Sequence, residues 1–174
     1  KNNMWLEKLI EPIEKDQTGL LAGVYGRQEP LSSSSPLDKR DLTVVFGLDE
    51  RTQEKDSFFH NANSALSKSI WEKFPFDEKT TNIEDRMWGA EVIKNGYRIH
   101  YTPHASVYHY HGINQGGKLD RAQKIVNIIE NLEGPFTEED IFNASTLLQE
   151  QIHNSPESAE KELLSSMYHL LQEM

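Results

Sequence analysis

The stretch GYRIHYTPHASVYHYHG, residues 96–112, carries the strongest structural signal in the chain. Residues 97–101 and 105–110 are rich in aromatic and β-branched side chains and predict two strands, one on each side of Pro103. The preceding residues 84–95, opened by an acidic pair and followed by a glycine, are typical of a helix. A helix that leads into strands indicates an α/β architecture.

Few elements are expected on the N-terminal side of this stretch. Apolar side chains at helical spacing predict a helix, and a short apolar run predicts a strand after it. A serine-rich loop, a further strand and a helix ended by Pro75 are expected to follow. These five elements cover, in order, residues 4–15, 20–25, 28–39, 43–48 and 63–74. Because a typical sheet has about four to six strands, this part of the chain looks like half of a domain.

The pattern becomes helical throughout after residue 117. Apolar residues recur at helical spacing over residues 119–132, and two more helices are expected near 137–152 and 156–172. We therefore expect an α/β domain over residues 1–117 and an all-helical extension over residues 118–174. The apolar side chains of the last helix would form an oligomerisation face made of Leu163, Leu164, Met167, Tyr168 and Leu171.

The composition argues against several kinds of partner. The net charge is −10, and residues 130–174, with ten acidic residues against Lys161, contribute −9 of it. Binding to nucleic acid or to anionic membranes depends on clustered Lys and Arg, so neither is expected. The sequence has no cysteine, which favours a reducing compartment and a cytoplasmic location. No apolar run approaches the roughly 18 residues that a membrane span needs.

Three motifs occur in a meaningful order. They are FFHNANSAL at residues 58–66, FDE at 76–78 followed by EDR at 84–86, and the stretch at 96–112. In this order and spacing they resemble the distal half of bacterial family-2 glycosyltransferases, and the resemblance spans residues 4–112. It implies a partial GT-A fold, which is a Rossmann-like mixed sheet with flanking helices, and sugar transfer with inversion.

One element of that family is missing. The sequence contains no Asp-x-Asp motif and lacks the strand–helix units that bind the nucleotide. We therefore expect the chain to be the acceptor-side half of a longer enzyme and to be inactive without the other half. The intact enzyme would use a divalent metal, Mn²⁺ or Mg²⁺.

The resemblance assigns the general base to Asp85, with Glu84 beside it as a supporting acceptor. A base must take the proton of the acceptor hydroxyl as that hydroxyl attacks the anomeric carbon. The start of a helix favours an ionised carboxylate by about 0.3–1 kcal/mol, which suits this role. The alternative is that the acidic pair only caps the helix.

Other positions are assigned in the same way. Asn61 and Asn63 match the turn that lines the sugar pocket, although asparagine also favours turns on its own. Arg86 would approach a diphosphate or pair with a neighbouring carboxylate.

The histidines of residues 104–111 suggest a metal. His109, with His111 as the alternate, matches the histidine that completes the metal site in several enzymes of this fold. The alternatives are imidazoles hydrogen-bonded to the backbone, or a zinc site that also includes His104.

Two hypotheses for function follow. In the first, the parent enzyme transfers a sugar from a nucleotide-sugar donor to a glycan or lipid-linked acceptor in bacterial surface-polysaccharide or glycoconjugate synthesis. In the second, the chain is a non-catalytic module that forms homo-oligomers through its C-terminal helices and carries an α/β remnant. A simple metal-binding domain is a third interpretation.

Overall fold

The computed structural model describes residues 4–79, 83–110 and 112, and isolated positions between 120 and 165. The chain divides into two compact units, residues 1–128 and 129–174, and the elements below all belong to the first. The predicted helices after residue 117, their oligomerisation face and His111 lie outside the described elements. The boundary at residue 117 stays a prediction.

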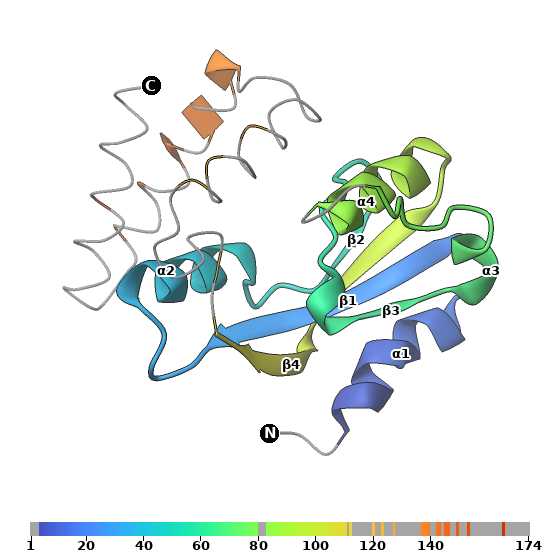
Figure 1. The fold of residues 1–174 in the computed structure, drawn as a ribbon, viewed down its shortest axis with the longest axis horizontal. Helices are drawn as coiled ribbons and strands as arrows, with labels where there is room; N and C mark the ends of the chain where they lie inside the picture. Colours follow the sequence, from blue (N-terminus) through green and yellow to red (C-terminus); the bar gives the residue numbers. More distant parts are fainter. Residues whose placement is uncertain are drawn as a thin grey trace. The chain divides into compact units, whose positions relative to one another are not determined.

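A four-stranded mixed sheet forms the centre of the first unit, with strand order β2-β4-β1-β3 (Figure 1). The two inner strands are parallel and long, whereas each outer strand has three residues and runs antiparallel to its neighbour. The strands are β1 (Leu21–Pro30), β2 (Arg51–Gln53), β3 (Ser64–Leu66) and β4 (Arg98–His109). The prediction of an α/β fold with a mixed sheet is confirmed, and its GT-A type stays a prediction.

Helices flank this sheet. They are α1 (Trp5–Lys15), α2 (Pro36–Val45), α3 (Lys68–Trp71) and α4 (Glu84–Lys94), with the 3-10 turn η1 (Asn61–Asn63) before β3. The predicted helices at 4–15 and 84–95 are confirmed. Within the described residues, no helix has the length and apolar character needed to cross a bilayer.

A β-bulge at the start of β1 distributes its side chains between two cores. The register of β1 against β4 shifts between Leu21 and Gly23, so the strict alternation of faces is interrupted. Leu21 and Val24 pack in one cluster with Leu9 of α1. Ala22 and Tyr25 pack in the other cluster, which also holds Trp88 and Val92 of α4. Helices α1 and α4 thereby pack against different side chains of the same strand, β1.

The region after β1 differs from its prediction. Strand β1 continues to Pro30, so the expected loop at 28–39 is shorter, and residues 43–45 belong to α2 rather than to a strand. The reason is a capped helix start. Ser35 accepts a hydrogen bond from the Asp38 backbone N–H at 3.1 Å, and Pro36 occupies the first helical position, where proline is favoured.

Two other predictions were wrong in kind. Residues 63–74 do not form one helix, because residues 64–66 pair with residues 23–25 of β1 and leave only the short α3 beyond them. The two strands expected around Pro103 are one strand, β4. The register passes from Gly26–Thr102 to Gln28–Val107, so Pro103 lies in an irregular segment where its missing N–H breaks no regular ladder.

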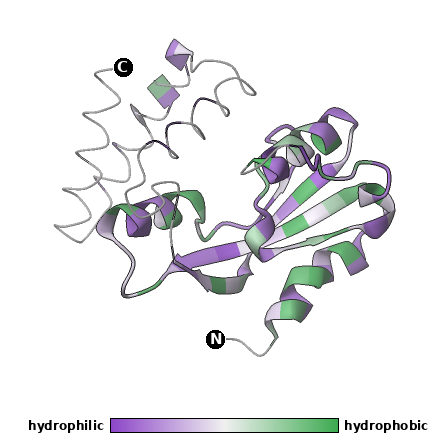
Figure 2. Ribbon diagram, in the orientation of Figure 1, coloured by the Kyte–Doolittle hydropathy of each residue, from purple (hydrophilic) through white to green (hydrophobic). Residues whose placement is uncertain are grey.

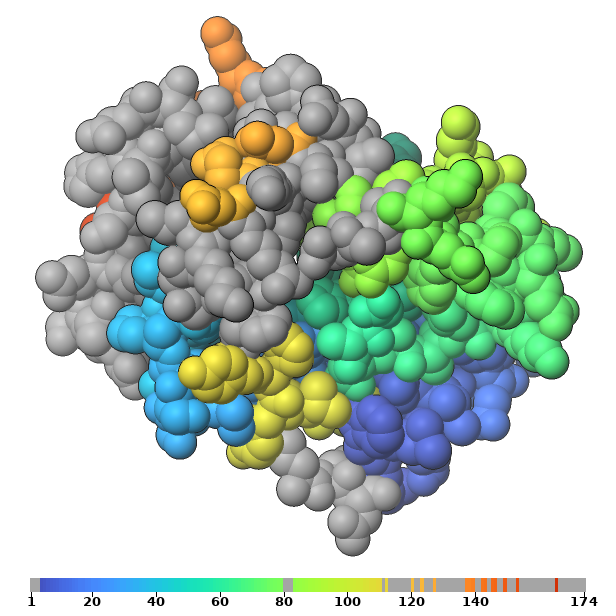
Figure 3. Space-filling model, in the orientation of Figure 1, coloured from blue at the N-terminus to red at the C-terminus, as the bar shows by residue number. Residues whose placement is uncertain are grey.

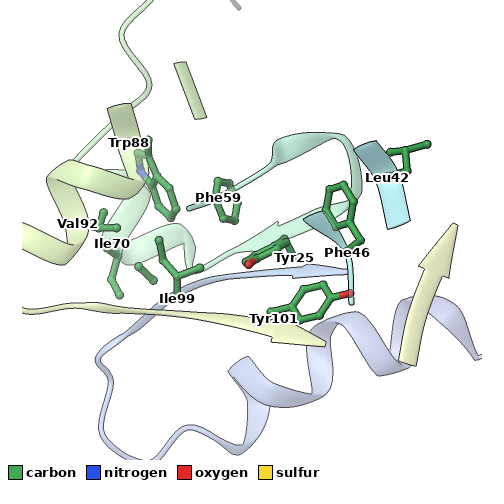
Figure 4. Packing of buried hydrophobic residues seen from close by; sticks show 10 residues of the cluster. Tyr25, Leu42, Phe46, Phe59, Ile70, Trp88, Val92, Ile99 and Tyr101 are labelled. Atoms are coloured by element: carbon green, nitrogen blue, oxygen red, sulfur yellow. The ribbon is translucent and has the colours of Figure 1, made fainter. Parts of the chain in front are cut away.

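The larger core is aromatic and lies between α4 and the inner strands (Figure 4). The Phe59 ring is fully buried, with its centroid 4.8 Å from that of Trp88 and 6.0 Å from that of Tyr25. Aromatic pairs in such geometry contribute about 0.5–1.5 kcal/mol beyond their area burial. Phe59 therefore anchors the segment that continues into His60 and η1.

We expect Gly89→Ala to destabilise the fold. Alanine favours a helix interior by about 0.5–1 kcal/mol over glycine. However, a Cβ at residue 89 would lie 2.1 Å from the Ser57 carbonyl oxygen, and overpacking costs about 1–3 kcal/mol. Denaturant unfolding should show a net loss of about 1–2 kcal/mol. The control is Gly47→Ala, where a Cβ meets nothing within 4 Å and stability should not fall. Equal stability of the two variants would contradict this packing.

Candidate functional site

The candidate site lies at the C-terminal end of the two parallel strands. Figure 2 shows β1 changing from hydrophobic to hydrophilic residues toward this end, where Arg27, Gln28 and Glu29 follow one another. Glu29 pairs with Tyr108, and Pro30 pairs with His109 at the end of β4. In α/β sheets, ligands bind at the carboxyl ends of parallel strands. Hydrogen bonds link η1 both to this end of the strands and to the start of α4.

Asp85, the predicted base, lies in the first turn of α4 and is only 9% exposed. Its carboxylate accepts hydrogen bonds from the backbone N–H of Asn61 at 3.1 Å and from its neighbour Arg86 at 2.8 Å. Burial nevertheless raises the pKa of Asp85 above its usual value, and the adjacent Glu84 adds to the increase. The helix start alone was expected to favour the ionised form, and desolvation outweighs it. A higher pKa strengthens a carboxylate as a proton acceptor.

Glu84 lies beside the same turn. Its Oε1 accepts a hydrogen bond from the Asn61 side-chain amide at 3.4 Å, while Oε2 is buried without a hydrogen-bond partner. An unsatisfied buried acceptor costs about 1–3 kcal/mol, so its retention requires an explanation. The structure thus brings together three predicted site residues, because Asn61 contacts both carboxylates and its own side chain remains exposed.

Asn63 occupies a different environment. It is 2% exposed, and its amide donates to the carbonyl oxygens of Arg27 at 3.1 Å and Ala105 at 2.8 Å. Its own carbonyl accepts from the Trp5 indole at 2.9 Å. These bonds tie β1, β4 and α1 together at one point. The geometry favours a structural role for Asn63 over the predicted contact with a sugar.

Arg86 follows the acidic pair on α4. The centre of its guanidinium lies 4.0 Å from the centroid of the Phe58 ring, in a cation–π arrangement. The side chain is partly buried. A contact between Arg86 and a diphosphate stays a prediction.

The histidines at this end of the sheet come from two segments. The His109 ring lies with its centroid 6.0 Å from that of His60, in a T-shaped arrangement. Across residues 4–79, 83–110 and the other described positions, no three His, Cys, Asp or Glu side chains gather in a way that could hold a metal ion. The described residues therefore do not form a complete metal site, and the role of His109 as a ligand stays a prediction.

Helix α2 lies against the end of β4. Ser34, just before α2, donates through its hydroxyl to the Tyr110 carbonyl at 2.6 Å, and the Gly112 N–H donates to Asp38 of α2 at 3.0 Å. Figure 3 shows the residues at the end of β4, in yellow, next to those of α2, in light blue. Tyr110 and Gly112 are thereby held at the same end of the sheet.

Sequence reasoning missed two residues of this region. Gln28 is 1% exposed, and its Nε2 lies 3.0 Å from Nδ1 of His60. Gln28 was assigned to the serine-rich loop at 28–39, and His60 was noted only as part of the motif at 58–66. No local signal marks Gln28 as buried, since its burial results from pairing with the distant β4.

Comparison with known proteins identifies two relatives. The O-antigen chain rhamnosyltransferase WbaN of Salmonella anatum is 31% identical over 111 residues, which cover 58% of this chain and 35% of WbaN. The O-antigen chain rhamnosyltransferase RfbN of Salmonella typhimurium is 28% identical over 112 residues, which cover 59% of this chain and 36% of RfbN. The chain thus spans about a third of the length of the curated relatives it matches. No family model matches it, and no solved structure matches it significantly. These similarities support the predicted resemblance to glycosyltransferases at this coarse level.

We expect Asp85→Asn to change how stability depends on pH. Because burial raises the pKa of Asp85, the folded state binds this proton more tightly than the unfolded state does. The contribution of Asp85 to the stability of the wild-type chain therefore falls as pH rises through that pKa, and the variant lacks this contribution. Thermal unfolding between about pH 4 and about pH 7 should show the Tm of the variant rising relative to wild type. A relative Tm that stays constant, or falls, would contradict a raised pKa.

Proposed function

We propose that this chain is the acceptor-side part of a glycosyltransferase that acts in bacterial surface-polysaccharide synthesis. The enzyme transfers a sugar from a nucleotide-sugar donor to a hydroxyl of a glycan or lipid-linked acceptor, with inversion. The observation that carries the proposal is the pair Glu84–Asp85 at the start of α4, held by Asn61 beside the carboxyl end of the parallel strands. The similarity to two O-antigen rhamnosyltransferases supports the substrate class.

The proposed chemistry is a single displacement. The acceptor hydroxyl oxygen forms the new bond to the anomeric carbon, and Asp85 takes the hydroxyl proton. At the same time the bond between that carbon and the oxygen of the nucleoside diphosphate breaks, and the nucleoside diphosphate leaves. Burial raises the pKa of Asp85, which favours this transfer. The Asn61 N–H fixes the orientation of the carboxylate.

Glu84 has a supporting role in this proposal. Its charge contributes to the raised pKa of Asp85, and its buried Oε2 has no protein hydrogen-bond partner. A hydroxyl of the bound acceptor would satisfy that oxygen. The cost of the unsatisfied acceptor would then be removed on substrate binding.

In this proposal the nucleotide-sugar donor is bound mainly by residues outside this chain. The nucleotide and the divalent metal, Mn²⁺ or Mg²⁺, would be bound mainly by a further part of a longer protein. His109 would add an imidazole ligand, and Arg86 would lie toward the diphosphate. A rhamnose donor is the first to test, because both relatives are named as rhamnosyltransferases.

We expect Asp85→Asn to lower the turnover of the intact enzyme by about 10²–10⁴-fold, since a positioned general base contributes that much. Sugar transfer to the acceptor, measured with saturating donor, provides the readout. The matched control is Glu91→Gln, which changes an exposed carboxylate at the other end of α4 and should leave turnover unchanged. Full activity of the Asp85 variant would rule out the assigned base.

A further inference from the structure

Gln28 is a buried polar residue that is only half satisfied. Its side chain is 1% exposed, its Nε2 faces His60, and its Oε1 is buried without a hydrogen-bond partner. An apolar side chain of similar size would avoid the cost of the unsatisfied oxygen. A buried polar side chain with such a cost requires an explanation. In Gln28 the explanation must come from Nε2, which contacts His60.

The contacts of His60 define its tautomer. Its Nδ1 lies 3.0 Å from Nε2 of Gln28 and 3.3 Å from the backbone nitrogen of Ala62. The backbone N–H of Ala62 can only donate, so Nδ1 must be the acceptor and carries no proton. The Gln28 amide must then also present its N–H, because the opposite orientation would place two lone pairs against each other. The neutral His60 ring thus carries its proton on Nε2.

His60 in turn holds the turn that contacts the acidic pair. Through Nδ1 it caps η1, and the next residue, Asn61, donates from its backbone to Asp85 and from its side chain to Glu84. Phe59 fixes the chain on the other side of His60 in the aromatic core. A continuous set of contacts therefore leads from the interior of β1 to the carboxylate at the start of α4.

We propose that Gln28 and His60 are a positioning pair: Gln28 adds a second donor at Nδ1 beside the Ala62 N–H, and thereby holds the His60 ring in the orientation that caps η1 and keeps Asn61 against Asp85. This inference rests on the proposed function only for its effect on sugar transfer. The tautomer and its dependence on Gln28 are properties of the chain itself. Neither residue needs to touch the substrate.

The first test compares two substitutions of buried glutamines, Gln28→Met and Gln53→Met. Gln53 is 4% exposed, and both ends of its amide are bonded: Oε1 accepts from Tyr25 at 2.7 Å, and Nε2 donates to the carbonyls of Asp56 and Phe58. Gln53→Met should therefore lower Tm clearly, whereas Gln28→Met, which removes an unsatisfied oxygen, should leave Tm unchanged or raise it.

¹⁵N NMR of the same two variants and of the wild-type chain measures which nitrogen of the His60 ring carries the proton. In the wild-type chain we expect the signature of a neutral ring protonated at Nε2. Gln28→Met leaves Nδ1 with only the longer of its two contacts, from Ala62 at 3.3 Å, so the ring should turn away from η1 more often and populate the other tautomer. Gln53→Met should leave the signature unchanged. A wild-type ring protonated at Nδ1, or a ring that does not respond to Gln28→Met, would overturn the proposal regardless of any activity.

The second test separates positioning from chemistry at His60. Asparagine places its Oδ1 close to where histidine has Nδ1 and is a good capping residue, so His60→Asn should retain most of the turnover of the intact enzyme. His60→Ala should lower turnover about tenfold or more with KM nearly unchanged, and combining it with Asp85→Asn should add little further loss. Equal inactivity of the Asn and Ala variants would overturn a positioning role. If Asp85→Asn alone has no effect, the proposed function fails, while the NMR result still decides the tautomer.

Discussion

The parallel pairing of β1 with β4 is the constraint on which the rest of the described structure depends. It runs from Leu21–Arg98 to Pro30–His109 and brings the carboxyl ends of both strands to one end of the sheet. The outer strands cover only three residues each, so they add little to this framework. The two breaks in register matter as much as the pairing itself. The first shares β1 between two cores, and the second accommodates Pro103 within β4.

At the polar end of this strand pair, side chains form hydrogen bonds with backbone groups that neighbouring strands would otherwise satisfy. Asn63 satisfies carbonyl oxygens of both strands, and the Asp85 carboxylate satisfies the N–H of Asn61. Such arrangements are costly to assemble, because each buried polar atom needs a partner. The atoms that lack one belong to Arg27, Gln28 and Glu84, among the residues with described side chains. All three lie on β1 or at the start of α4, in the region where the proposed chemistry takes place.

The sequence predicted correctly those elements that depend on interactions between residues close together in the chain. Helices α1 and α4 follow from apolar spacing, acidic residues in the first turn and a glycine after the last turn of α4. The acidic pair and Asn61 were identified from their motif and do meet in space. Helix α2 was missed although Ser35 and Pro36 mark its start, because the run of serines suggested a loop. The polar half of β1 and the burial of Gln28 could not be predicted from local sequence, since both result from contact with β4.

The Asn63 side chain also has a consequence for the backbone of the two inner strands. The register of β1 against β4 shifts between Gly26 and Gln28, so the regular exchange of backbone hydrogen bonds is interrupted there. At this interruption the Asn63 amide donates to the carbonyls of Arg27 and Ala105, and the Trp5 indole donates to the amide oxygen. One buried side chain thereby gives both strands a donor where their regular pairing breaks, so the irregular segment around Pro103 costs less than it would with an apolar residue at position 63.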